Sequence, residues 1–195
     1  MKTTRPQIDV SLVLAVSDAE ETVGRDIKTF TLHMSSLGLG FEIVAVNDGS
    51  RDNSLAVLKL LERQIPELRV IYRDVSGRAF VRGTSEATGH TVILARTENR
   101  PLTWAPLGWA LGRLDAGKDA VVLRSRYVVA RRLACLPAVA RSRGNTAAFE
   151  RRFENEALQL SIESVGARRT SSVIADVAEM LRAPLRRLPF AFPRF

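Results

Sequence analysis

The chain has 195 residues, of which 46% are hydrophobic and 26% are charged; these proportions are typical of one globular domain with a sizeable core and exclude a disordered or collagen-like chain. Lysine and arginine outnumber aspartate and glutamate by 29 to 21, which gives a formal net charge of +8. This excess favours anionic partners such as phosphates or acidic membrane, and we find no nucleic-acid-binding motif to extend it to DNA or RNA.

The first part of the chain predicts alternating strands and helices. Two apolar runs, 10–16 and 41–46, are typical of parallel strands buried on both faces. A helical pattern over 23–34 follows the first run, and Ser17 or Asp18 is expected to cap it. Strand, helix, strand is the order of a βαβ unit, so we expect an α/β protein with a mostly parallel central sheet flanked by helices.

The stretch 41–54, FEIVAVNDGSRDNS, is the centre of this prediction. Its strand ends in the turn-forming residues 47–50, and a helix is expected from about Asn53. Asp48 therefore lies at the carboxyl end of a buried strand, where ligands bind in open α/β sheets. An ordinary Asp-Gly turn explains the same residues equally well, so this stretch alone leaves both interpretations open.

Further elements are predicted along the rest of the chain. The patterns indicate strands at 68–72, 90–95 and 119–123, and helices at 78–87, 102–114, 131–143 and 149–165. Pro137 is expected to interrupt the third of these helices. Trp104 and Trp109 are expected to pack in the core. A last strand at 167–174 and a last helix at 175–181 would complete a single domain over 1–181.

Residues 182–195, RAPLRRLPFAFPRF, form a basic and aromatic tail with four arginines and no acid. Its prolines argue against a continuous helix. Two interpretations stay open. The tail docks on its own domain or on another protein, including a second copy, or it attaches reversibly to an anionic membrane through its Arg and Phe side chains.

Cysteine content and apolar runs indicate the compartment. Cys135 is the only cysteine, which excludes an intrachain disulfide, and the sequence has no Cys/His cluster for zinc. Residues 1–9 lack the apolar core of a signal peptide, and no apolar run approaches the roughly 20 residues of a membrane span. We expect a cytoplasmic protein, either soluble or peripheral to a membrane.

Five segments, taken together and in order, resemble the family 2 glycosyltransferases, which have the GT-A fold, a Rossmann-like nucleotide-diphospho-sugar transferase fold. They are SLVLAVSDAEETV, FEIVAVNDGSRDNSLAVL, FVRGTSEATGHTVILA, DAVVLRSRY and FENEALQLSIESVGAR, and they span residues 10 to about 169. The resemblance is greatest to the polyprenol- or dolichyl-phosphate mannose synthase branch. It implies transfer of a sugar from a nucleotide-sugar to an acceptor, with inversion.

The resemblance also implies a set of nucleotide-binding residues. Asp48 matches the acidic position that contacts the base, and Asn47 replaces the aspartate commonly beside it. Ala15 and Ser17 occupy the Pro and Tyr positions that line the base pocket. Arg126 matches the arginine that approaches the phosphates, a task that suits a guanidinium fork.

The chain departs from the family at the metal motif. The family's Asp-x-Asp, whose carboxylates bind a divalent cation that neutralises the diphosphate, aligns with Arg96, Thr97 and Glu98. Arg96 would repel a cation and could pair with the diphosphate directly, so it joins the nucleotide-binding candidates. We expect no cofactor, with Mg²⁺ or Mn²⁺ bound only if Glu98 keeps a metal role.

The acceptor side also departs from the family. The segment that borders the acceptor is deleted before residue 149, and 168–172 lacks the lysine of the family's phosphate-binding segment. Glu150 and Glu154 are expected on a solvated helix face, so no general base and no catalytic residue is assigned.

Three functions stay open. The first is a degenerate family 2-like pseudoenzyme that keeps nucleotide or nucleotide-sugar binding. The second is a non-catalytic scaffold or regulatory protein that self-associates or binds a protein partner. The third is an active, metal-independent transferase with Arg96 and Arg126 as an electrophilic clamp.

Overall fold

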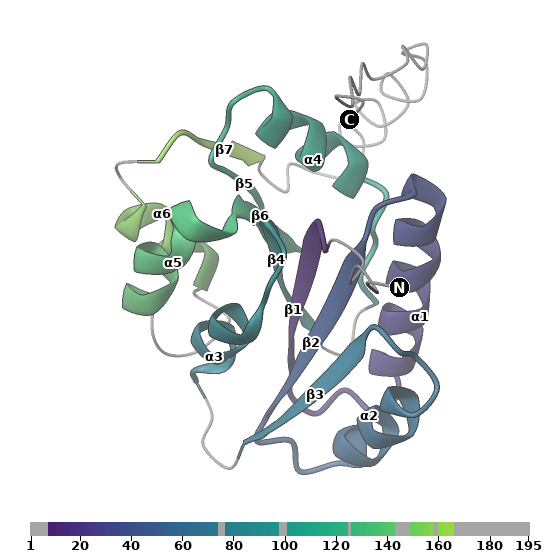
Figure 1. Cartoon of the computed structure of the whole chain (residues 1–195). Helices are drawn as coiled ribbons and strands as arrows, with labels where there is room; N and C mark the ends of the chain where they lie inside the picture. Colours follow the sequence, from purple (N-terminus) through teal and green to yellow (C-terminus); the bar gives the residue numbers. More distant parts are fainter. Residues whose placement is uncertain are drawn as a thin grey trace, which may run out of the picture.

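The computed structural model of the chain describes residues 8–73, 77–97, 101–124, 126–142, 149–157 and 160–165. In this part of the chain a seven-stranded sheet, in the order β3-β2-β1-β4-β6-β5-β7, has helices on both faces (Figure 1). The predicted α/β fold with a mostly parallel sheet is confirmed, because β6 alone among the described strands runs antiparallel to its neighbours.

The described elements follow the predicted order closely in the first half of the chain. The strands are β1 (Val10–Val16), β2 (Phe41–Asp48), β3 (Leu68–Arg73), β4 (Thr91–Thr97), β5 (Ala120–Leu123), β6 (Tyr127–Arg131) and β7 (Ile162–Val165). The helices are α1 (Val23–Leu37), α2 (Ser54–Glu62), α3 (Ala79–Glu86), α4 (Leu107–Asp115), α5 (Arg132–Arg141) and α6 (Phe149–Glu156).

Two core layers hold the sheet between its helices. Every residue of β1 is buried, as expected of a central strand covered on both sides. Side chains alternate along each strand, so one set packs against α1, α2 and α4 and the other against α3, α5 and α6. The predicted core position of Trp104 is confirmed, because its ring packs against Phe30 and Tyr127 in the first layer.

Four details of the predicted elements are wrong. Residues 149–165 do not form one helix: α6 ends at Glu156, and β7 follows because Ile162–Val165 pairs with β5. Strand β6 was not predicted, since its five residues follow directly on the turn closed by the Arg126 N–H and the Leu123 carbonyl. Pro137 lies inside α5 without ending it.

The fourth detail that is wrong is the predicted cap of α1 by Ser17 or Asp18. The helix begins after Thr22, and its Ncap residue makes no side-chain cap hydrogen bond. The Asp18 carboxylate accepts instead from the Arg51 N–H at 2.7 Å, which ties the loop after β1 to the loop after β2. The predicted strand at 167–174, helix at 175–181 and tail at 182–195 lie outside the described residues.

The outer edge of β3 is covered by a side chain of α2. The Val70 N–H donates to Glu62 Oε1 at 2.6 Å, and the Tyr72 hydroxyl donates to Glu62 Oε2 at 3.1 Å. An exposed strand edge offers unpaired backbone groups to other chains. Glu62 therefore supplies an acceptor for a backbone N–H that points away from the sheet and that no neighbouring strand of the described sheet binds.

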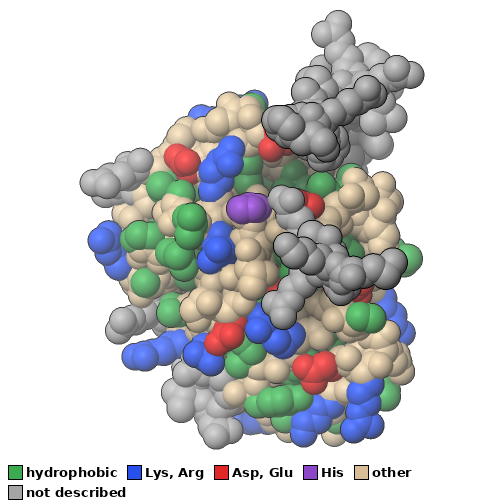
Figure 2. All heavy atoms as spheres, viewed as in Figure 1, with side chains coloured by type: hydrophobic (Ala, Val, Ile, Leu, Met, Phe, Trp, Pro, Cys, Tyr) green, Lys and Arg blue, Asp and Glu red, His purple; other side chains and the backbone are tan. Residues whose placement is uncertain are grey.

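The basic residues do not gather on one visible face. Figure 2 shows Lys and Arg side chains dispersed among acidic and apolar ones on the face that it presents. No helix within the described residues has both the length and the apolar character that crossing a membrane requires.

A close approach between α3 and the sheet depends on Gly83. A Cβ atom placed on Gly83 would lie 2.2 Å from Cγ1 of Val13 and 3.2 Å from Cγ2 of Val46. The first distance is too short for any real Cβ atom, so Val13 or the helix would have to move, and the second is tight enough to require a small shift of Val46. The glycine therefore sets the distance between α3 and the strands that carry Ala15 and Asp48.

We predict that Gly83→Ala lowers the free energy of unfolding by about 1–3 kcal/mol, because the added methyl overpacks the core. Gly112→Ala is the matched control: Gly112 also lies in a helix, and a Cβ there meets nothing within 4 Å. The control should be neutral or stabilising by up to about 1 kcal/mol. Urea unfolding measures both, and equal stabilities of the two variants would contradict the prediction.

Candidate functional site

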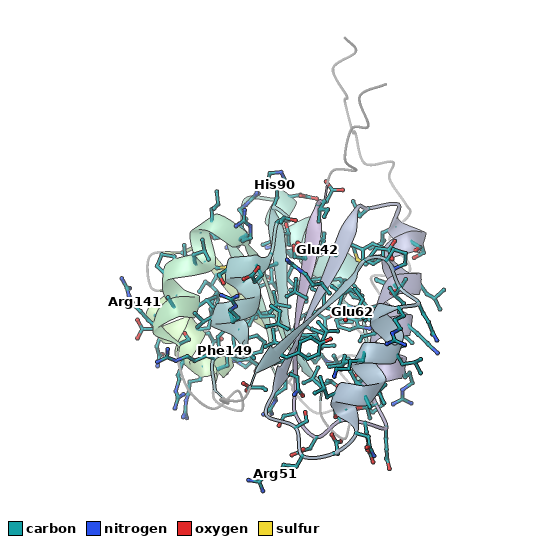
Figure 3. The ribbon with its side chains drawn as sticks, turned by 60° about the horizontal axis from the view of Figure 1, so that its bottom comes forward. Glu42, Arg51, Glu62, His90, Arg141 and Phe149 are labelled. Atoms are coloured by element: carbon teal, nitrogen blue, oxygen red, sulfur yellow. The ribbon has the colours of Figure 1, made fainter. Side chains whose placement is uncertain are left out.

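The carboxyl ends of the parallel strands form one edge of the sheet, where ligands bind in open α/β folds. The chain leaves β1 and β2 through helices on one face and leaves β3 through α3 on the other. The direction of the connections therefore reverses between β1 and β4, which are neighbours in the sheet. Ala15 and Arg96 are register partners at this switch point. Figure 3 shows Arg51 near this edge, with Glu42 and His90 toward the opposite end.

Three of the predicted residues lie on the α3 side of this edge. Ala15 is buried in the core layer under α3, and Asp48 and Arg96 lie on the same face at the ends of the two strands beside it. Both carboxylate oxygens of Asp48 accept from the Gly77 N–H, at 3.0 and 3.1 Å. In this structure Asp48 fastens the chain just before α3, so a bound base would have to share this carboxylate with Gly77.

The other two residues of the base pocket are placed differently. Asn47 lies on the opposite face from Asp48, because neighbouring side chains of a strand alternate. Asn47 is 5% exposed, and its Oδ1 has no hydrogen-bond partner within the described residues. Ser17 is exposed in the loop after β1. The structure therefore separates Asn47 from Ala15, Asp48 and Arg96.

Acidic side chains bind the loops after β1 and β2 to each other. Asp52 Oδ2 accepts from the Glu20 N–H at 2.9 Å, and Glu20 Oε2 accepts from the Asn53 N–H at 2.8 Å. The Ala19 N–H donates to Ser54 Oγ at 2.8 Å. These reciprocal bonds use the carboxylates of the two loops to hold backbone donors, which gives the edge a fixed shape.

Arg96 and Arg126 are neighbours across two adjacent strands. The antiparallel register of β4 and β6 pairs Ala95 with Tyr127, so Arg96 follows one partner and Arg126 precedes the other. Both side chains are half-buried. Burial lowers the pKa of Arg96, and the nearby Glu150 opposes that shift. A guanidinium keeps its charge at neutral pH regardless, so two cationic residues lie on neighbouring strands at the end of β4.

The donor chemistry at this point does not fit a divalent cation. Arg96 stands where the family's first carboxylate is expected, and a guanidinium offers no lone pair to a metal. Glu98 lies outside the described residues. Within the ranges that the structure describes, no group of three or more His, Cys, Asp or Glu side chains could hold a metal ion.

A buried carboxylate on α1 positions the chain after β4. Asp26 has no solvent exposure. Its Oδ2 accepts from Thr97 Oγ1 at 2.8 Å, and its Oδ1 accepts from the Leu102 N–H at 3.0 Å. The Trp104 indole N–H donates to the Asp26 carbonyl at 3.3 Å. Sequence reasoning missed Asp26, although a lone acid on the apolar face that includes Val23 was a usable signal.

Glu154, which the sequence predicts on a solvated helix face, is partly exposed and hydrogen-bonded to two side chains. One guanidinium nitrogen of Arg124 donates to both Glu154 carboxylate oxygens at 3.1 Å, and Ser164 Oγ donates to Oε1. The Glu154 side chain is 19% exposed. Residues 168–172, where the family has its late phosphate-binding segment, lie outside the described residues.

Solved glycosyltransferase structures share this architecture. The mannosyltransferase PcManGT from Pyrobaculum calidifontis, solved with GDP-Man and Mn²⁺, is 14% identical, with a TM-score of 0.62 over 85% of this chain and 56% of that one. Residues 1–349 of S. aureus TarS are 12% identical, with a TM-score of 0.59 over 83% of this chain and 59% of that one. The chain therefore spans less than two thirds of both proteins.

This chain matches a larger share of a third solved structure. Glucosyl-3-phosphoglycerate synthase from Mycobacterium tuberculosis, solved with Mn²⁺, UDP-Glc and phosphoglyceric acid, is 15% identical, with a TM-score of 0.58 over 88% of this chain and 76% of that one. Residues 20–95 match the family described as Glycosyl transferase family 2. The chain has the fold of a family 2 glycosyltransferase.

The resemblance to family 2 inferred from the sequence is therefore confirmed, and the GT-A fold with it. The family match ends one residue before Arg96, so the position of the metal motif falls just outside it. A search of curated proteins found no match. Placement of this family 2 glycosyltransferase-like protein near the dolichyl-phosphate mannose synthase branch stays a prediction.

Asp26 generates a pH-dependence prediction. Burial raises the pKa of Asp26, although hydrogen bonds from Thr97 and Leu102 oppose the shift. The native state then holds this proton more tightly than the unfolded state, so the contribution of Asp26 to stability rises as pH falls. We expect wild type to gain stability relative to Asp26→Asn as the pH is lowered from 7 toward 4, measured by urea unfolding.

Asp52→Asn is the control, because its stability relative to wild type should change with pH in the opposite direction. Burial raises the pKa of Asp52, but hydrogen bonds from Ser54 and from the Glu20 N–H outweigh it and leave this pKa lowered. Wild type should therefore lose stability relative to Asp52→Asn as the pH falls through the unfolded value of about 3.9 and toward the lower native pKa, so this pair is measured below pH 4 as well. Parallel pH profiles of wild type and Asp26→Asn would show that Asp26 does not titrate as described.

Proposed function

We propose that this protein is a glycosyltransferase-like pseudoenzyme that binds a nucleotide or nucleotide-sugar at the carboxyl edge of its sheet without a metal. The observation that carries the proposal is the pair Arg96 and Arg126 at the ends of neighbouring strands, beside the switch point. Two guanidinium groups can hold a diphosphate through charge-assisted hydrogen bonds. The similar structures solved with GDP-Man or UDP-Glc support a nucleotide-sugar as the ligand class.

The contacts of two glutamates support the proposed loss of sugar transfer. A transferase needs an acid–base group free to take the acceptor's proton. Glu154 is held by Arg124 and Ser164, and Glu150 lies beside Arg96. With Arg96 in place of a metal ligand, the site favours binding over turnover.

Binding would use the two sides of the edge differently. Arg96 and Arg126 would hold the phosphates, while Asp48 would accept a hydrogen bond from the base. Ala15 lies between them in the sheet, where its buried methyl group would underlie the ligand. Ser17 would contact the ligand from the exposed loop after β1. Asn47, whose side chain lies on the opposite face, would contribute only its backbone.

A titration of the intact protein with UDP, GDP, UDP-Glc and GDP-Man, with and without Mn²⁺, tests the proposal. A ligand at 100 times its dissociation constant should add roughly 2.7 kcal/mol to the free energy of unfolding. We expect affinity to be independent of Mn²⁺ and to fall about tenfold or more in Arg96→Met, because a charged hydrogen bond contributes about 1.5–3 kcal/mol.

Arg82→Met is the matched control, since Arg82 on α3 pairs only with Glu86 among the described acidic side chains and should leave affinity unchanged. Asp48→Asn should alter the preference between bases and leave inorganic diphosphate binding intact. Sugar transfer to any acceptor would favour the active metal-independent enzyme. Absence of nucleotide binding would favour the scaffold or regulatory protein.

We further propose a cytoplasmic protein that reaches anionic membrane through residues 182–195. Each basic residue near such a surface contributes about 1 kcal/mol, and the Phe rings add apolar burial. Sedimentation with vesicles should show binding to anionic but not neutral lipid, lost when 182–195 is deleted. Equal recovery with both vesicle types would instead assign the tail to docking on protein.

A further inference from the structure

The sheet register places three arginines just beyond one row of residues. Ala95 of β4, Tyr127 of β6 and Leu123 of β5 form this row across three neighbouring strands. Arg96 follows Ala95, while Arg126 and Arg124 lie on either side of the turn that joins β5 to β6. Strands lie about 4.8 Å apart, so the three backbones fall within roughly 10 Å of one another.

Helix α6 faces these arginines with two glutamates. Glu150 lies close enough to Arg96 to oppose the shift of its pKa, and Glu154 accepts from Arg124 at 3.1 Å. Residues four apart share one face of a helix, so the two carboxylates form a stripe. The Arg124 side chain is 54% exposed, against 19% for Glu154, so the pair remains open to solvent on its basic side.

The position of α6 does not depend on this acidic stripe. Phe149 and Phe153 form the adjacent apolar row, and both are buried. The Phe149 ring centroid lies 4.3 Å from that of Phe80 on α3, which packs α6 against α3 in one core layer. The carboxylates can therefore leave the arginines by rotation of their side chains while the helix stays packed.

We propose that Glu150 and Glu154 occupy, from within the chain, the anion site formed by Arg96, Arg124 and Arg126, so that a diphosphate binds only in competition with α6. This inference rests on the proposed function, since it names the regulation of the same site. It adds Arg124 to the phosphate-binding residues. The two glutamates act as an internal counter-anion that lowers affinity and keeps the site closed to weakly charged ligands.

Neutralising the stripe should strengthen binding. We expect Glu150→Gln and Glu154→Gln each to raise the affinity for inorganic pyrophosphate and for UDP by roughly two- to fivefold, as estimated from the strength of exposed ion pairs. The double variant should show a larger gain than either single variant. Isothermal titration of the full chain at fixed ionic strength measures all three, with circular dichroism to confirm that each variant is folded.

Glu156→Gln is the matched control. It removes the same charge from the same helix, but Glu156 faces Arg141 at 4.0 Å and not the three arginines. A gain in the stripe variants without a gain in this control supports the inference.

Two results would overturn it, and they differ in what they say of the proposed function. Equal diphosphate affinity in wild type, the stripe variants and the control would refute the competition while leaving the proposed binding intact. No diphosphate binding in any variant, with all of them folded, would refute the competition and the proposed binding together. Adding Arg124→Gln to the Glu154→Gln variant tests the role of Arg124 by itself. If the two variants bind diphosphate with equal affinity, Arg124 is not a phosphate-binding residue.

Discussion

A carboxylate without solvent exposure, that of Asp26, determines where the chain runs after β4. A buried charge is costly unless it is hydrogen-bonded, and Asp26 meets that condition through Thr97 and Leu102. These two partners lie on either side of the segment that follows Arg96. The position of the arginine at the switch point therefore depends on a residue of α1 that touches no ligand in the proposed site.

Acidic and basic side chains lie on different parts of the same edge. The acidic side chains of the loops after β1 and β2 hold backbone N–H groups, and Asp48 holds Gly77. The arginines lie on the other side, at the ends of β4 and β5. An edge of this kind favours an anionic ligand at the strand ends, because the nearby acids are already engaged with the protein itself.

Much of the fold could be predicted, and the failures have physical causes. The runs that form β1, β2 and β4 are long, apolar and bounded by turn residues, so the sequence alone indicates that they are strands and where they end. Residues 149–165 carry a helical pattern that continues into β7, and only pairing with β5, about 40 residues earlier in the chain, decides otherwise.

The site was harder to predict than the fold. Arg96 could be found because the resemblance aligned it with a metal ligand, whereas its proximity to Glu150 joins residues more than 50 positions apart. Asn47 and Asp48 are adjacent in sequence, yet alternation along β2 sends them to opposite faces. Contacts of this kind depend on the three-dimensional packing of α6 and the sheet, which no local pattern specifies.

Glu62 has a consequence for assembly. A second molecule could lengthen this sheet at β3 only by displacing the carboxylate from the Val70 N–H, and it would also have to move Tyr72. Backbone pairing between copies is thus opposed at that border. Association of two copies at this border would therefore have to use side chains and not the pairing of strands.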